Sequence, residues 1–403
     1  MAKETSDFNK TPSANRVHIS FFGKRNAGKS SLVNAVTGQK LAIVSDVKGT
    51  TTDPVHKAME LLPLGPVVIT DTPGIDDVGI VGEMRVERTQ RVLAKTDLAV
   101  LVVDGFVGLS DDDFALIEKF REKKIPFIVV LNKADLVASC DASDYDFPYV
   151  KVSAVSGEGI DGLKEKLAEM AKPLEVSKRI IGDKIGSGDV VVLVTPIDAS
   201  APKGRMILPQ VQTIRDILDG HAICMVCQTE ELEGCLSALK EPPALVVTDS
   251  QVFGEVKRML PEDVMLTSFS ILFARLKGIL DTAVAGARFV SSLQDGDRVL
   301  ISEGCTHHRQ CEDIGTVKLP GWIEKYAGCT LEFDFTSGGE FPTEAEVLQK
   351  YALVVHCGGC MLNEREMIHR MDFARQCKVP FTNYGTLIAH INGILERSLK
   401  IFE

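Results

Sequence analysis

The chain has 403 residues, of which 45% are hydrophobic and 25% charged, and its formal net charge is −11. This length exceeds what one hydrophobic core serves and predicts roughly two to four domains. The acidic balance argues against a large nucleic-acid-binding face, and only 6% of the residues are aromatic, which leaves little material for stacking bases. No stretch has the roughly 20 apolar residues of a membrane span, and the polar start is unlike a signal peptide, so we expect a cytoplasmic protein.

Short β-branched runs alternate with helical stretches along the sequence, which predicts α/β folds with parallel sheets. We expect three such domains, at residues 17–173, 190–268 and 269–403. A polar tail (1–16) precedes the first domain, and a polar, glycine-containing linker (174–189) follows it.

The first predicted strand leads into the sequence GKRNAGKS, residues 23–30, which has the spacing of a phosphate-binding P-loop and opens a helix. Glycines let the backbone N–H groups turn toward phosphates, and the helix N-terminus adds its positive dipole end. Lys29 places a charge on the terminal phosphates, and the Ser30 hydroxyl is a ligand for Mg²⁺. Nucleotide binding is therefore assigned to this loop and the residue after it: Gly23, Asn26, Ala27, Gly28, Lys29, Ser30 and Ser31.

Three further stretches follow predicted strands in the order that a guanine-nucleotide site requires. In DTPG, Asp71 can hold Mg²⁺ through water and the Gly74 amide can face the γ-phosphate. In NKAD, which starts with Asn132 and Lys133, the Asp135 carboxylate can accept two adjacent N–H donors of guanine, which adenine lacks. In SAVSG, Ser153 and Ala154 offer a backbone amide to the guanine carbonyl. Together these stretches predict a GTP site.

Residues 16–172 resemble the TrmE–Era-like branch of translation-factor-type GTPases. The resemblance implies that GTTTD (49–53) is switch I, with Thr51 as the second hydroxyl on Mg²⁺, and that Asn26 helps to bind K⁺. Ile75 stands where Ras-like enzymes have the glutamine that orients the attacking water. We therefore expect slow intrinsic GTP hydrolysis that K⁺ or a partner accelerates.

Two predicted strands of the third domain end in residues that bind metals. RVLISEG is followed by Cys305 and His307, and YALVV is followed by His356, Cys357 and Cys360. The carboxyl ends of neighbouring parallel strands converge on one sheet edge, so these residues can meet there. Thiolates suit either zinc or an iron–sulfur centre, and the residues alone leave both open. By contrast, Cys224 and Cys227 lie within an apolar strand and are interpreted as core.

The pattern Cys-x-His followed by His-Cys-x-x-Cys, behind such a GTPase domain, is similar to that of the FeFe-hydrogenase maturation GTPases, the HydF family. The resemblance covers essentially the whole chain. It implies a 4Fe–4S cluster on Cys305, Cys357 and Cys360, with His356, His307 or an exchangeable ligand at the fourth iron. It also implies that the middle domain forms a homodimer. The protein would be a scaffold that receives a diiron precursor from two radical-SAM maturases and delivers it to the apo-hydrogenase.

Two other functions compete with this hypothesis. One is a GTPase of RNA or ribosome metabolism with a structural zinc domain, against which the acidic charge and few aromatic residues weigh. The other is a GTPase switch attached to a zinc-stapled α/β domain. The remaining metal-binding residue types of the third domain are assigned no role: Cys311, Cys329, Cys377 and His308.

Overall fold

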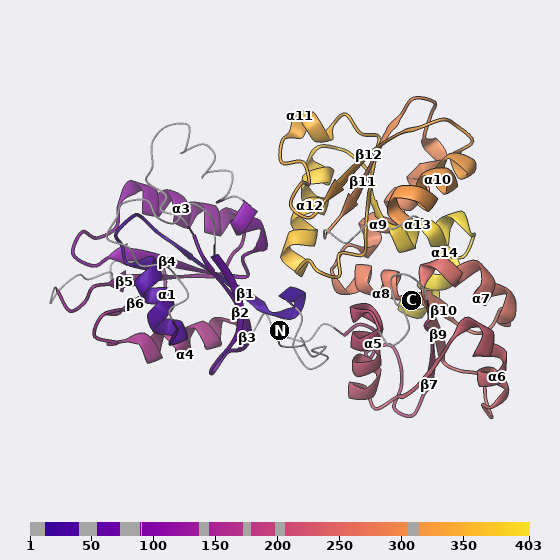
Figure 1. The fold of residues 1–403 in the computed structure, drawn as a ribbon, viewed down its shortest axis with the longest axis horizontal. Coiled ribbons are helices and arrows are strands. Elements are labelled where there is room, and N and C mark those ends of the chain that lie inside the picture. Colours follow the sequence, from indigo (N-terminus) through magenta and orange to yellow (C-terminus); the bar gives the residue numbers. More distant parts are fainter. Residues whose placement is uncertain are drawn as a thin grey trace, which may run out of the picture. The chain divides into compact units, whose positions relative to one another are not determined.

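The computed structural model describes residues 13–39, 55–72, 89, 91–136, 145–171, 179–197, 206–304 and 314–403. The chain forms two compact units, Met1–Ser177 and Lys178–Glu403. Three sheets, two wholly parallel and one with a single antiparallel edge strand, confirm the α/β prediction (Figure 1). Within the described ranges, no helix has the length and apolar content needed to cross a membrane.

The first unit has a six-stranded sheet in the order β2-β3-β1-β4-β5-β6. Its central strands are almost continuously buried because helices cover both faces, α1 and α4 on one and α3 on the other. Only β2 is antiparallel to its neighbour. The elements are β1 (Val17–Phe22), α1 (Lys29–Thr37), β2 (Val55–Leu61), β3 (Gly65–Asp71), β4 (Leu98–Asp104), α3 (Asp111–Glu122), β5 (Phe127–Asn132), β6 (Tyr149–Lys151) and α4 (Ile160–Ala171).

The second unit begins with a four-stranded parallel sheet in the order β10-β9-β7-β8, so that β7 and β9 are central. Strands β7 and β9 consist mainly of valine and leucine and are almost fully buried. Its elements are β7 (Val190–Val194), α5 (Leu208–Asp219), β8 (Ile223–Cys227), α6 (Leu232–Ser237), β9 (Leu245–Thr248), α7 (Phe253–Met259), β10 (Leu266–Ser268) and α8 (Phe269–Leu276).

The same unit continues into a second parallel sheet, in the order β12-β11-β13-β14. Strands β11 and β13 are neighbours in its centre, which brings the residues after them to one sheet edge. Its elements are α9 (Leu280–Phe289), β11 (Arg298–Glu303), α10 (Leu319–Ala327), β12 (Glu332–Ser337), α11 (Ala345–Leu348), β13 (Leu353–His356), α12 (Glu364–Gln376), β14 (Phe381–Asn383), α13 (Tyr384–Ile391) and α14 (Leu395–Leu399).

The two sheets of the second unit share hydrophobic cores. Ile394 and Leu395, at the start of α14, are buried in the same core as Val192 of β7, and α14 lies beside β10 (Figure 1). At the other end, Ile180 and Ile181 pack against the middle sheet, although they fall in the segment predicted to be a linker. Their apolar side chains gain more from burial than from solvent exposure, so this half of the segment belongs to the folded unit.

Candidate functional site

The predicted P-loop connects β1 to α1. Gly23 and Gly28 have φ angles of 141° and 86°, and a Cβ on either would collide with Val102 or Asn132, so only glycine fits these positions. The Lys29 ammonium is buried against the loop and donates hydrogen bonds to the carbonyl oxygens of Gly23 (2.8 Å) and Lys24 (2.7 Å). The loop thus presents the N-terminus of α1 together with a fixed cation, as anion binding requires.

Asn26 lies at the tip of this loop. It is exposed and has a left-handed backbone with φ of 61°, a conformation that asparagine tolerates better than most residues. Its proposed contact with K⁺ stays a prediction.

The candidate Mg²⁺ site brings together Ser30 from α1 and Asp71 from the end of β3. The Ser30 hydroxyl donates to Asp71 Oδ2 at 2.7 Å. The other carboxylate oxygen, Oδ1, is buried without a hydrogen-bond partner among the described residues. Burial raises the pKa of Asp71, opposed by the Ser30 hydrogen bond and the Lys29 charge. An orphaned carboxylate oxygen beside a serine hydroxyl fits a hydrated Mg²⁺, the hard cation that such oxygens bind. The other two residues of the predicted catalytic set, Thr51 and Gly74, lie outside the described residues, as does Ile75.

At the predicted base-binding edge, Asn132 connects two loops by hydrogen bonds. Its Nδ2 donates to the Ala27 carbonyl oxygen of the P-loop (2.9 Å), and its Oδ1 accepts from the Ala154 amide (3.1 Å). Lys133 forms an ion pair with Asp104, at the end of β4, with Nζ and Oδ2 2.6 Å apart. Asp135 follows with an exposed side chain, at the position predicted to read guanine.

The Ser153 side chain contacts its own loop, and the contact of a backbone amide of this stretch with guanine stays a prediction. The Ser153 hydroxyl is buried and accepts a hydrogen bond from the Ser156 amide at 3.0 Å, which closes the loop locally. Asp104 is a further residue of this edge, and its motif does not predict it. It lies at the end of its own strand, in a DG pair, but only the parallel pairing of β4 with β5 places it opposite Asn132 and beside Lys133.

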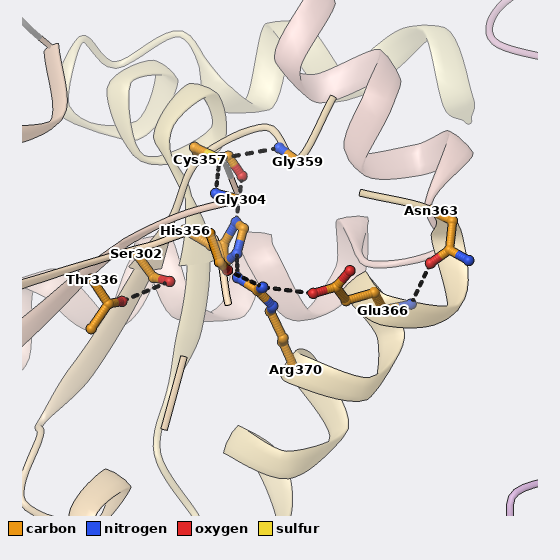
Figure 2. Close-up of polar contacts among 10 residues, drawn as sticks. Ser302, Gly304, Thr336, His356, Cys357, Gly359, Asn363, Glu366 and Arg370 are labelled. Carbon is orange, nitrogen blue, oxygen red and sulfur yellow. Dashed lines mark hydrogen bonds and ion pairs between the residues drawn. The ribbon is translucent and has the colours of Figure 1, made fainter. Parts of the chain in front are cut away.

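The second candidate site lies at the carboxyl edge of the C-terminal sheet. Ser302 of β11 pairs with His356 of β13, and the Cys357 amide donates to the Ser302 carbonyl oxygen at 2.8 Å. The Cys357 sulfur accepts two backbone N–H groups, from Gly304 (3.1 Å) and from Gly359 (3.4 Å), as Figure 2 shows. Such N–H···S hydrogen bonds stabilise a thiolate over a thiol. Residue 304 precedes Cys305, so the backbone of one predicted ligand segment contacts the sulfur of the other.

Cys360 is half-buried at the same edge. Burial raises the pKa of its thiol, and the nearby Lys277 ammonium opposes this increase. Lys277 is itself buried and donates to the Leu362 carbonyl oxygen.

The other predicted ligands, Cys305 and His307, lie outside the described residues, as do Cys311 and His308. Within the ranges given above, no group of three or more histidine, cysteine or acidic side chains is arranged to hold a metal.

The geometry speaks against His356 as the fourth metal ligand. Its ring is fully buried, Nδ1 lies 2.8 Å from the Cys357 carbonyl oxygen, and Nε2 lies 3.0 Å from Arg370. Both ring nitrogens therefore have hydrogen-bond partners within the protein, which leaves neither available to bind a metal in this arrangement. Burial and the Arg370 charge lower the pKa of His356 to about 3, which keeps the ring neutral. Its place beside a Cys-x-x-Cys pair suggested a ligand, but the sequence does not show which groups surround the ring.

Comparison with known protein families shows which family this chain belongs to. The hydrogen maturase F dimerization domain matches residues 180–278, and the hydrogen maturase F tetramerization domain matches residues 281–401. Together they account for more than half of the chain. The chain belongs to the hydrogen maturase F (HydF) family.

The N-terminal part of this HydF protein is a GTPase domain, because a family described as 50S ribosome-binding GTPase matches residues 18–133. The tRNA modification GTPase MnmE of Chromobacterium violaceum is 38% identical over 157 residues, which are 38% of this chain and 34% of that protein. GTPase Der of Wolinella succinogenes is 38% identical over 186 residues, 42% of this chain and 38% of that protein. The chain thus spans about a third of the length of the curated relatives it matches.

A probable GTP-binding protein engB of known structure is 25% identical. It covers 39% of this chain and 100% of its own, with a TM-score of 0.32. Other cysteines of the second unit contribute to its hydrophobic cores. Cys227 is buried, and burial raises the pKa of the Cys224 thiol to about 11 and that of Cys227 to about 12, as suits core residues. Cys377 is likewise buried in a core.

Proposed function

We propose that this chain is a GTP-hydrolysing scaffold of FeFe-hydrogenase maturation, which holds a 4Fe–4S cluster and delivers a diiron precursor to the apo-hydrogenase. Membership of the HydF family supports the maturation role, and the GTPase domain supports nucleotide hydrolysis. The cluster, the delivery step, the two radical-SAM maturases as donors and a cytoplasmic location are parts of this proposal. Dimerization and tetramerization domains support a homo-oligomer.

In the GTPase half, each described residue has a chemical task. The P-loop amides and Lys29 bind the phosphates, Ser30 and Asp71 hold Mg²⁺, and Asp135 selects guanine. Mg²⁺ supplies neutralisation of the charge that develops on the phosphates. We include Asn26 as a K⁺ contact, so hydrolysis is expected to be several-fold slower in Na⁺ than in K⁺. Equal rates in the two salts would remove this assignment.

In the cluster half, Cys305, Cys357 and Cys360 are the proposed ligands. The described surroundings of Cys357 support this proposal. Two N–H groups converge on the Cys357 sulfur, and Gly359, with φ of 62°, lies where a Cβ would collide with Met367. The cluster would supply one iron whose fourth ligand is exchangeable, and His307 is a candidate for that ligand. A second metal unit would dock at this iron.

One observation gives the main support for the cluster part of the proposal: the Gly304 amide donates a hydrogen bond to the sulfur of Cys357, 53 residues later in the sequence. Gly304 immediately precedes Cys305, so its contact with the Cys357 sulfur supports a site that the two predicted ligand segments share. The parallel pairing of β11 with β13 is the structural cause of this contact.

Anaerobic reconstitution of the full chain with iron and sulfide tests the proposal. We expect a brown protein with about four iron and four sulfide per chain. Cys357→Ser should lose most of this iron, whereas the control Cys329→Ser should retain it. Cys329 is a suitable control because its sulfur donates to the Leu293 carbonyl oxygen, away from the sheet edge. A colourless protein that binds one zinc tightly would support the zinc-stapled alternative. Salt-sensitive retention of RNA by the cluster-free protein would support the alternative in RNA metabolism.

A further inference from the structure

A buried ion pair contacts His356, the residue that precedes Cys357. Arg370 and Glu366 face each other one turn apart on α12, with Arg370 Nη2 and Glu366 Oε1 2.7 Å apart and only 4% and 8% of their side chains exposed. Arg370 also donates to the Gly338 carbonyl oxygen at 2.6 Å, and its guanidinium lies 5.2 Å from the centre of the Phe341 ring. A buried ion pair contributes little net stability because desolvation offsets the attraction between the charges. Stability alone therefore does not explain why these charges are here.

The ion pair fixes the protonation of His356. A guanidinium has no acceptor, so Nε2 of His356 must accept the hydrogen bond from Arg370 (3.0 Å). A carbonyl has no donor, so Nδ1 must carry the hydrogen and donate it to the Cys357 carbonyl oxygen (2.8 Å). The ring is held between Phe341 and Phe381, with centroids 6.4 and 5.9 Å away. A single neutral tautomer is thus imposed by the partners on either side.

This chain of contacts ends on the backbone of Cys357, as Figure 2 shows. The Cys357 carbonyl is held by His356, and its amide by the Ser302 carbonyl oxygen. With both peptide groups of Cys357 fixed, the direction of its Cα–Cβ bond is fixed too. The sulfur then meets the amides of Gly304 and Gly359.

We propose that Arg370, anchored by Glu366, is a positioning residue that acts through His356 to orient the Cys357 thiol. His356 accordingly supports a ligand and is not one itself. The identity of the metal unit rests on the function proposed above, but the positioning of the thiol does not. The two ideas can therefore fail separately.

The first experiment uses the metal-free full chain and amide hydrogen exchange. Arg370→Gln should accelerate exchange in residues 357–362 and at Gly304 by roughly five- to tenfold, the effect of about one lost hydrogen bond. β11 and α10 should exchange as in the wild type. The matched control is Arg375→Gln, five residues along the same helix, whose partner Asp372 lies on the exposed side. Acceleration across the whole second unit, or none in residues 357–362, would overturn the proposal.

If Arg370→Gln does not fold because Glu366 loses the opposite charge of its buried ion pair, the double variant Arg370→Gln/Glu366→Gln replaces both charges with amides and is read in the same way. Two His356 variants then test whether Arg370 acts on Cys357 through His356. His356→Asn keeps a donor near the position of Nδ1 and should retain most of the protection, whereas His356→Leu should lose it. Equal protection in both variants would show that the hydrogen bond to Cys357 has no positioning effect.

The second experiment asks whether His356 is a ligand. In the reduced, reconstituted protein, pulsed electron paramagnetic resonance should give the same nitrogen couplings for the wild type and His356→Asn. Loss of a strongly coupled nitrogen in His356→Asn would make His356 a ligand and overturn the proposal. If the chain bound no iron at all, the proposed function would fail, while the exchange experiment would still test the positioning.

Discussion

The Asp71 carboxylate is buried at a point where its charge has little solvation. Burial raises its pKa above the ordinary value of 3.8 despite the Ser30 hydrogen bond and the Lys29 charge. The folded protein therefore holds the proton more tightly than the unfolded chain does. The resulting stabilisation is full below the ordinary pKa and is lost as the pH rises through the raised pKa. At neutral pH the carboxylate is a destabilising charge that Mg²⁺ would relieve.

We predict that Asp71→Asn stabilises the nucleotide-free protein at pH 7, by about 1 kcal/mol or roughly 2–4 °C. It should also flatten the loss of stability as the pH rises through the acid range, and abolish the stabilisation by Mg²⁺ and GDP. Thermal melts between about pH 4 and 8 measure both effects. Asp161→Asn, which changes an exposed carboxylate on α4, is the control and should behave as the wild type. A less stable Asp71→Asn at pH 7 would contradict this account of the site.

A second prediction at this scale concerns the choice of base. In Asp135→Asn, the carboxylate with its two acceptor oxygens becomes an amide with one donor and one acceptor. The amide no longer matches the two N–H groups of guanine but does match the N–H and carbonyl groups of xanthine. We expect GDP to bind about 100-fold more weakly, since two charge-assisted hydrogen bonds are affected, and XDP to bind more tightly than before. Competition between GDP and XDP measures the change. An unchanged preference for GDP would mean that another residue reads the base.

At the scale of the secondary-structure elements, α14 has partners that are far away along the chain. Leu395 is buried in the same core as Val192 of β7 and Val246 of β9, roughly 150 to 200 residues away along the chain. Arg397 donates to the Val264 and Pro261 carbonyl oxygens, which brings α14 next to the approach to β10. Helix α14 thus completes the core of the middle sheet.

We therefore predict that Leu395→Ala lowers the free energy of unfolding by about 2–5 kcal/mol, as expected for a large-to-small change in a core. Amide exchange should accelerate in β7 and β9 as well as at the C-terminus. Val317→Ala, which truncates an exposed residue of the same unit, serves as the matched variant and should change little. If only the last residues exchanged faster, α14 would not support the middle sheet.

The molecule as a whole combines two units with separate chemistry. The cores of Met1–Ser177 are built from its own strands and helices, and those of Lys178–Glu403 from the later elements. The nucleotide residues lie in the first unit, and the cysteine residues that we propose as cluster ligands lie in the second. A change that disables one site without unfolding its unit should leave the other intact.

Accordingly, Lys29→Ala should reduce GTP turnover by at least about 100-fold, given the loss of a charge on the transferred phosphate, while the reconstituted iron content stays unchanged. Cys357→Ser should lower the iron content and leave GTP turnover within about twofold of the wild type. Phosphate release and iron analysis on the same samples measure both. Loss of both activities in either folded variant would show that the sites depend on each other.

Motifs contained in a short stretch could be predicted from the sequence alone. The P-loop, NKAD and the valine-rich strands each depend on neighbours within a few residues, so spacing and residue type already specify their local geometry. The α/β class followed from the alternation of strands and helices. That the ends of β11 and β13 come together was also expected, because parallel strands share one carboxyl edge.

Tertiary structure alone decided the contacts between residues far apart in sequence. Asn132 is hydrogen-bonded to Ala27, Gly304 is hydrogen-bonded to Cys357, and α14 packs against the middle sheet. In none of these contacts does the sequence around one partner predict the other partner. His356 is the sharpest case. Its sequence neighbours indicate a ligand, but the partners of its two ring nitrogens are set by the turn after β13 and by Arg370 on α12. A side chain's chemistry depends on which hydrogen-bonding groups surround it, and packing determines those groups.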